Sequence, residues 1–164
     1  MVDKTVPYTK QVSFKRNLQF EHMFIVPRVH RGGGLVLFWK SSINLSVETS
    51  SKNLIDCIIG KGSEGAWLFT GFYGKPITHK RCELWDLLWQ LNNQFCLPWS
   101  CFGDFNEIVR GSKKVGGNNR SHAQMQLFRD TIDECGFLDM GFKGTLFTWE
   151  KKIQQWANHL GEIG

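Results

Sequence analysis

The segment Leu97-Pro98-Trp99-Ser100-Cys101-Phe102-Gly103-Asp104-Phe105-Asn106-Glu107-Ile108 begins as an apolar run and ends in polar residues that lead into a glycine-rich loop. The first half predicts a strand and the second half a turn at its end. Alternate residues of an extended segment point to the same side, so the Asp104 carboxylate and the Asn106 amide can converge on one phosphate or metal ion. Metal-assisted hydrolysis of a phosphoester needs such a pair. The alternative is an Asx-type turn, in which both side chains bond only to local backbone.

A second segment, Gly71-Phe72-Tyr73-Gly74-Lys75-Pro76, also reads as a strand end followed by a turn. A Tyr at this position can present its hydroxyl outside the sheet, where it could bind a phosphate oxygen. The alternative is an amphipathic residue at the edge of the core. The two segments are separated by a helical pattern, and together they favour a site built from two strand ends.

Short apolar runs separated by turn-forming residues predict strands over residues 23–26, 35–39, 43–47, 54–59 and 67–73. The glycines Gly32 to Gly34 match no phosphate-binding motif and precede no helix, so they predict a hairpin turn. Residues 1–17 show no clear period, and we expect a loosely held arm there.

Apolar residues at spacings of three and four predict two helices. The first runs from Thr78 to about Asn93, and its stripe consists of Leu84, Leu87, Leu88 and Leu91, widened by Trp85 and Trp89. The second begins at a capping box, ends at a glycine cap, and is defined by Ser121, Gln124, Met125, Phe128, Ile132, Cys135 and Gly136. A last strand is predicted over residues 145–149. Strands followed by alternating helices and strands indicate a sheet with helices on at least one face.

The composition is that of one globular domain of 164 residues, 41% hydrophobic and 21% charged. No apolar run is long enough for a membrane span, and the N-terminal region lacks the layout of a signal peptide, so we expect an intracellular, soluble chain. The five cysteines show no CxxC spacing, which supports neither a disulfide framework nor a zinc site. The net charge of +5 fits binding of a polyanion, or an ordinarily solvated basic surface.

In the order and spacing of its motifs the chain resembles the endonuclease/exonuclease/phosphatase superfamily, and specifically the apurinic-type endonuclease domain of plant LINE (non-LTR) retrotransposons. The resemblance runs from about Leu18 to Trp149. It is carried by Phe24-Ile25-Val26-Pro27, Gly33-Gly34-Leu35, Leu37-Phe38-Trp39-Lys40, Phe69-Thr70-Gly71-Phe72-Tyr73-Gly74, Lys80-Arg81, Leu97-Pro98-Trp99, Gly103 to Ile108, Gly116-Gly117, the helix from Gln124-Met125 to Gly136, and Phe147-Thr148-Trp149. It divides the chain into an arm (1–17), a partial domain (18–150) and a divergent tail (151–164).

The resemblance implies a four-layer α/β sandwich, in which two mixed β-sheets are flanked by helices, incomplete in this chain. It also implies that a divalent metal, usually Mg²⁺, assists water in attacking a DNA phosphodiester. Tyr73 would hydrogen-bond the scissile phosphate, while Asp104 and Asn106 would orient the phosphate and the attacking water. The residues carried over as DNA-binding are Thr148 and Trp149 beside the groove, and Lys113 and Lys114 at backbone phosphates.

The chain departs from the family pattern at both ends. Tyr8-Thr9-Lys10 stands where a Glu-Thr-Lys with the metal-ligating Glu is expected, and residues 151–164 replace the family's terminal Ser-Asp-His region. No protein ligand is therefore assigned to Mg²⁺. Loss of one general acid or base typically lowers the rate by about 10² to 10⁴, so we expect weak activity or none. Missing outer strands would also leave sheet edges bare, which favours self-association.

Three functions remain open from the sequence. The first is a Mg²⁺-dependent DNA endonuclease domain, truncated and impaired. The second is a non-catalytic DNA-binding remnant of a decayed retroelement, and the third is the same fold acting on a small phosphate ester or phosphoinositide. DNA is the expected partner, with neither a membrane nor an obligate protein partner inferred. A nuclear location follows only from the resemblance.

Overall fold

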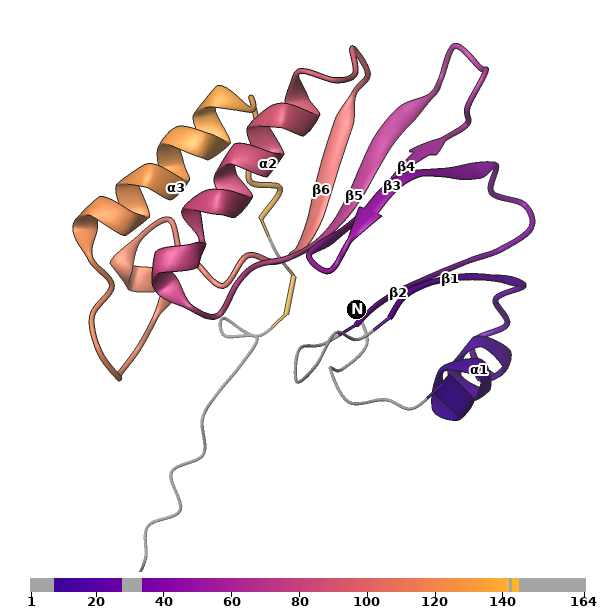
Figure 1. The fold of residues 1–164 in the computed structure, drawn as a ribbon, viewed down its shortest axis with the longest axis horizontal. Helices are drawn as coiled ribbons and strands as arrows, with labels where there is room; N and C mark the ends of the chain where they lie inside the picture. Colours follow the sequence, from indigo (N-terminus) through magenta and orange to yellow (C-terminus); the bar gives the residue numbers. More distant parts are fainter. Residues whose placement is uncertain (1–7, 28–33, 142, 145–164) are drawn as a thin grey trace, which may run out of the picture.

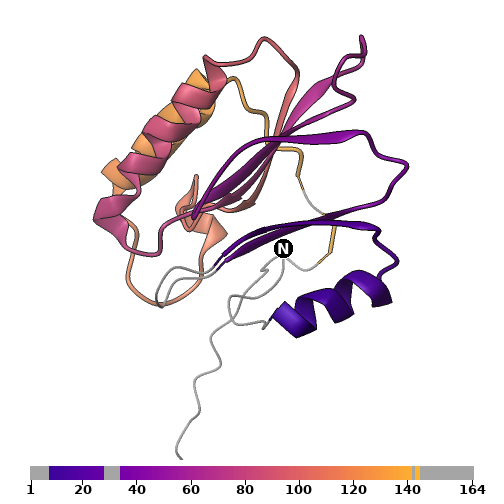
Figure 2. The same ribbon diagram turned by 45° about the vertical axis from the view of Figure 1, so that its right-hand side comes forward.

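A four-stranded sheet, a two-stranded sheet and helices form the layers of an incomplete α/β sandwich (Figure 1). The computed structural model describes residues 8–27, 34–141 and 143–144. Helices α2 (Cys82–Asn92) and α3 (His122–Glu134) cover one face of the larger sheet. The smaller sheet lies on its other side, and α1 (Tyr8–Asn17) lies beyond that, as the turned view in Figure 2 also shows. The predicted fold class is confirmed.

The larger sheet is mixed, with the order β3-β4-β5-β6. Its strands are β3 (Leu45–Ser51), β4 (Leu54–Ile59), β5 (Trp67–Tyr73) and β6 (Trp99–Asp104). The first three pair antiparallel, whereas β5 and β6 pair parallel. A parallel neighbour requires a crossover connection, and this one contains the short 3₁₀ helix η1 (Thr78–Lys80) and α2. The carboxyl ends of β5 and β6 therefore lie at the same edge of the sheet.

The smaller sheet consists of β1 (His22–Val26) paired antiparallel with β2 (Leu35–Trp39). Its position explains why β4, apart from Asp56, is apolar without alternation: both faces of β4 are covered, and residues 54–58 are all buried. The expected hairpin turn at Gly32 and Gly33 lies outside the described residues, although the strands on either side pair as a hairpin does.

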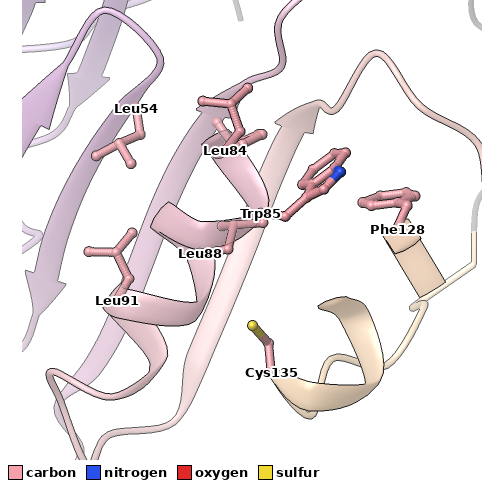
Figure 3. Packing of buried hydrophobic residues seen from close by; sticks show 8 residues of the cluster. Leu54, Leu84, Trp85, Leu88, Leu91, Phe128 and Cys135 are labelled. Atoms are coloured by element: carbon pink, nitrogen blue, oxygen red, sulfur yellow. The ribbon is translucent and has the colours of Figure 1, made fainter. Parts of the chain in front are cut away.

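The core lies between the larger sheet and the helix pair (Figure 3). Leu84, Leu88 and Leu91 of α2 are buried against Leu54 of β4, and Trp85 stacks on Phe128 of α3 with ring centroids 4.6 Å apart. The expectation that Trp89 widens this stripe is wrong, because its side chain is 53% exposed. A helix has about 3.6 residues per turn, which carries position 89 past the edge of the face that contains the leucines.

The two ends of α3 differ in how well the sequence predicted them. Gly136 has a φ of 67°, and the Phe137 N–H bonds to the Ile132 carbonyl while the Gly136 N–H bonds to the Asp133 carbonyl. This is a Schellman motif, so the predicted glycine cap is confirmed. At the other end, Ser121 has the extended backbone of an N-cap, but its side chain makes no cap hydrogen bond. The predicted capping box is therefore wrong.

The structure corrects the expectation of a loosely held arm for residues 8–17, which form α1. The helix carries Lys15 and Arg16 in its last turn, where cations favour the helix dipole. Its sequence, Tyr8 to Asn17, is polar on most sides, so it offers no apolar period from which a helix could be predicted. The strand predicted over 145–149 and the tail 151–164 lie outside the described residues. None of the described helices is both long and apolar enough to cross a membrane.

Candidate functional site

Tyr73 and Asp104 come together at the carboxyl ends of β5 and β6. They are register partners in the parallel pair, and each is the last residue of its strand. Asp104 is exposed and Tyr73 is half-buried. In open α/β sheets, ligands bind outside the carboxyl ends of parallel strands, so this edge is where a site is expected on physical grounds.

Asn106 joins them through the turn that follows β6. The Asn106 N–H donates to Asp104 Oδ1 at 2.8 Å, and the Asn106 side-chain amide donates to the Gly74 carbonyl at 2.8 Å. The Asx turn weighed as the alternative is therefore present at Asp104. Two further side-chain oxygens, Oδ2 of Asp104 and Oδ1 of Asn106, take no part in these two hydrogen bonds.

Phe105 anchors this turn to the core. Its ring stacks on Phe72 with centroids 5.0 Å apart and lies 5.4 Å from Phe128 of α3. Asn106 then takes a left-handed backbone conformation with φ of 54°, which Asn tolerates better than most residues. The polar residues thus sit outside the sheet because the aromatic residue between them is held inside.

Two glycines allow the strand ends to approach closely. A Cβ on Gly74 would lie 2.0 Å from the Phe105 carbonyl oxygen, and one on Gly103 would lie 1.8 Å from the Phe72 carbonyl oxygen. The Gly74 N–H also donates to the Asp104 carbonyl at 2.6 Å. No side chain fits at either position, so the geometry of the site depends on both glycines.

Asn53, in the turn between β3 and β4, holds the backbone of Tyr73 from the other side. Its side-chain amide donates to the Tyr73 carbonyl at 2.8 Å, and the Tyr73 N–H donates to the Asn53 carbonyl at 2.7 Å. Asn53 is itself buried. The last residue of β5 is therefore fixed by two hydrogen bonds to the turn between β3 and β4.

An ionic group with a buried carboxylate at its centre joins the two site loops. We call Arg81, Glu107 and Arg120 the Glu107 cluster. The Glu107 carboxylate accepts from Arg81 Nη1 at 2.6 Å, and its other oxygen lies 3.4 Å from Arg120 Nε. Arg81 also donates to the carbonyls of Lys75 and Pro76, both at 3.0 Å. The loop after β5 is thereby joined to the turn after β6.

The loop between β6 and α3 carries the lysines that the resemblance assigns to DNA. Lys113 ends the short 3₁₀ helix η2 (Gly111–Lys113), and the Lys114 ammonium donates to the Asn118 carbonyl. At its start the loop is held by Arg129 of α3, which donates to the Val109 carbonyl at 2.6 Å. Thr148 and Trp149 lie outside the described residues.

The described residues offer Mg²⁺ few ligands. Within that part of the chain, no group of three His, Cys, Asp or Glu side chains is arranged to hold a metal ion. At the strand ends the Asp104 side chain is exposed, whereas Glu107 is held by two arginines. Mg²⁺ at phosphate sites is often held by one or two carboxylates, substrate phosphates and several waters. Asp104 and Asn106 could therefore hold only a Mg²⁺ ion that keeps most of its water ligands.

Sequence reasoning noted Arg81 and Glu107 as parts of motifs, and Arg81 and Arg120 among the basic loop residues that fit polyanion binding, but it gave none of the three a role in the site. The sequence did show two charged residues in unusual places: Glu107 directly follows Asn106, and Arg81 precedes the apolar stripe of a helix. Neither signal shows that three charged side chains far apart in the sequence come together in the fold. No protein-family model matches this chain, and no curated protein matches it either.

Proposed function

We propose that this chain is a Mg²⁺-dependent phosphodiesterase domain that cleaves DNA, similar to the LINE endonuclease domain of the endonuclease/exonuclease/phosphatase superfamily, with weak turnover. The observation that carries the proposal is the register pairing of Tyr73 with Asp104 at the ends of two parallel strands, with Asn106 bonded across to the Gly74 carbonyl. The resemblance assigned these three residues to phosphate chemistry, and the fold brings them to one edge of the sheet.

In this proposal two of the three side chains bind the phosphate, and the third orients the attacking water. The Tyr73 hydroxyl would donate to a phosphate oxygen. The Asp104 carboxylate would accept a hydrogen bond from the attacking water, while the Asn106 amide helps to align the phosphate. Mg²⁺, when bound, would neutralise charge that develops on the phosphate. Weak turnover is expected because Asp104 is exposed and has no second free carboxylate beside it among the described residues.

Plasmid nicking by the monomeric gel-filtration fraction tests the proposal. Wild type should nick supercoiled plasmid with Mg²⁺ and not with EDTA. Asp104→Ala should lower the rate by about 10² to 10⁴, and Tyr73→Phe by about 10². Asp86→Ala removes the same type of side chain from the exposed face of α2 and should leave nicking unchanged.

Other outcomes would replace the proposal with one of its alternatives. Salt-sensitive binding of DNA without nicking favours a non-catalytic DNA-binding remnant, a reading that the +5 net charge also supports. Cleavage of a small phosphodiester with the plasmid left intact would assign the site to small phosphate esters. Nicking that survives EDTA or Asp104→Ala would contradict the assignment of the site itself. A nuclear location would follow from the DNA substrate.

A further inference from the structure

The Glu107 cluster has a net positive charge. Arg81 and Arg120 together supply two positive charges against the single carboxylate of Glu107. Neither guanidinium pairs with another carboxylate among the described residues. The surplus charge lies directly beside the turn that contains Asp104 and Asn106.

The two arginines differ in burial and in the hydrogen bonds that they make. Arg81 has 4% of its side chain exposed, and all three of its nitrogens donate, one to the Glu107 carboxylate and two to backbone carbonyls. Arg120 has 28% of its side chain exposed. Its Nη2 donates to the Asn106 carbonyl at 3.2 Å, while its buried Nε has no hydrogen-bond partner among the described residues. The Nε lies at ion-pair distance from Glu107, but without hydrogen-bond geometry.

Balancing Glu107 does not account for Arg120. Arg81 already gives that carboxylate a hydrogen-bonded partner at 2.6 Å, and a second guanidinium overcompensates it. A guanidinium has five N–H donors in a planar fork, which suits the oxygens of a phosphate. The exposed part of Arg120 therefore has unused donors, and its contact with the Asn106 carbonyl places it at the end of β6.

We propose that Arg120 is the anion-binding residue of this site and that it binds a phosphate oxygen at the ends of β5 and β6. Glu107 is its positioning residue, because the carboxylate fixes the guanidinium against the turn. The inference rests on the proposed function for the source of that phosphate, which is the backbone of DNA.

Titration of the full chain with inorganic phosphate tests Arg120 without depending on DNA. The Arg120 Nε–H and the Asn106 and Glu107 backbone amides are followed by NMR at constant ionic strength, with chloride as the reference anion. These resonances should shift saturably with phosphate and not with chloride. Arg120→Gln should weaken phosphate binding by about tenfold or more, as expected for a lost charge-assisted hydrogen bond. Arg120→Lys keeps the charge and should lose less.

The control is Arg16→Gln, which removes the same charge from α1 on the far side of the small sheet (Figure 1) and should leave phosphate affinity unchanged. A purely structural role would show as a lower melting temperature of Arg120→Gln with unchanged phosphate affinity, and that result would overturn the proposal. Absence of a phosphate-specific shift at the wild-type Arg120 Nε–H would overturn it as well, even if no variant folds.

Nicking assays on the same samples separate this inference from the proposed function. Phosphate binding at Arg120 in a protein that never nicks DNA would refute the phosphodiesterase proposal and support the anion site. Nicking by a protein whose Arg120 resonances ignore phosphate would support the enzyme and refute the anion site.

Discussion

Two buried carboxylates, one in the turn after β6 and one in the middle of the larger sheet, have partners of opposite kinds. At the strand ends, Glu107 is buried between two guanidiniums. In the middle of the sheet, the fully buried Asp56 of β4 accepts a hydrogen bond from the Thr70 hydroxyl, which in turn accepts from the Trp99 indole N–H at 2.8 Å. The second Asp56 oxygen has no partner among the described residues. We call Asp56, Thr70 and Trp99 the Asp56 row.

The difference lies in the charge of the partners. Glu107 has two positively charged partners, Arg81 and Arg120. Asp56 has only neutral partners, and burial, the largest cause, raises the pKa of its carboxyl above the usual 3.8. The comparison teaches that a buried charge is compensated at the strand ends and not in the middle of the sheet, which is why we propose the phosphate site at the strand ends.

The largest expected effect comes from breaking the Glu107 cluster. Arg81→Met removes one partner and should lower the free energy of unfolding by about 3 to 5 kcal/mol, because it breaks a buried ion pair on one side only. Urea unfolding measures this. Adding Glu107→Leu should recover part of the loss, since an apolar pair leaves no buried carboxylate behind. A loss below about 1 kcal/mol would mean that the cluster is solvated like a surface pair.

A second substitution tests whether the strand ends need their close approach. Gly103→Ala places a Cβ 1.8 Å from the Phe72 carbonyl oxygen, and should lower the free energy of unfolding by about 3 kcal/mol or more. Thermal or urea unfolding would show it. The control Gly65→Ala has open space around its Cβ and should change stability little. Equal effects of the two variants would contradict the packing described for β5 and β6.

The Asp56 row should respond to pH in the direction opposite to a salt-bridged carboxylate. With a raised pKa in the folded state, native Asp56 keeps a proton that the unfolded chain releases above about pH 3.8. Its contribution is most favourable below that pH and is lost as pH rises through the folded-state pKa. Asp56→Asn removes this titration, so the variant should gain stability relative to wild type as pH rises from 4 to 7. Urea unfolding of both proteins at pH 4 and pH 7 measures the difference. The prediction is contradicted if the variant gains stability relative to wild type as the pH is lowered.

The smallest effect is expected at an exposed ion pair. Lys61 of the β4–β5 turn lies 2.7 Å from Glu48 of β3, and 52% of the lysine side chain is exposed. Lys61→Ala should cost less than about 1 kcal/mol, and the difference should shrink in high salt. Unfolding at two salt concentrations checks this. A larger loss that does not depend on salt would show that this exposed pair stabilises the fold as a buried pair does.

Much of the fold was predictable because its signals are local. The strands Leu35–Trp39, Leu54–Ile59 and Trp67–Tyr73 have the predicted bounds, since each is an apolar run bounded by turn-forming residues. β3 starts two residues later than predicted and runs on to Ser51, and β6 extends to Asp104. Helix α1 was missed because it has no apolar stripe.

The candidate site was predictable in its residues but not in its geometry. The sequence placed Tyr73 and Asp104 each at a strand end, but their register pairing depends on the crossover through α2. The Asx turn at Asp104 was one of the alternatives that the sequence left open. The hydrogen bond from Asn106 to the Gly74 carbonyl could not be predicted, because it joins two strand ends that a helix separates in the sequence. The partners of Glu107 could not be predicted, because burial of charged residues is a property of the assembled layers.

By itself the sequence determined where apolar runs, turns and cap glycines occur, and hence most elements of an α/β fold, because these depend on residues close to one another along the chain. Only the tertiary structure decided that β5 and β6 are parallel neighbours, that two glycines let their ends touch, and that Arg81 and Arg120 meet at the buried carboxylate of Glu107. Those outcomes depend on which surfaces pack together, and packing joins residues that no local pattern relates.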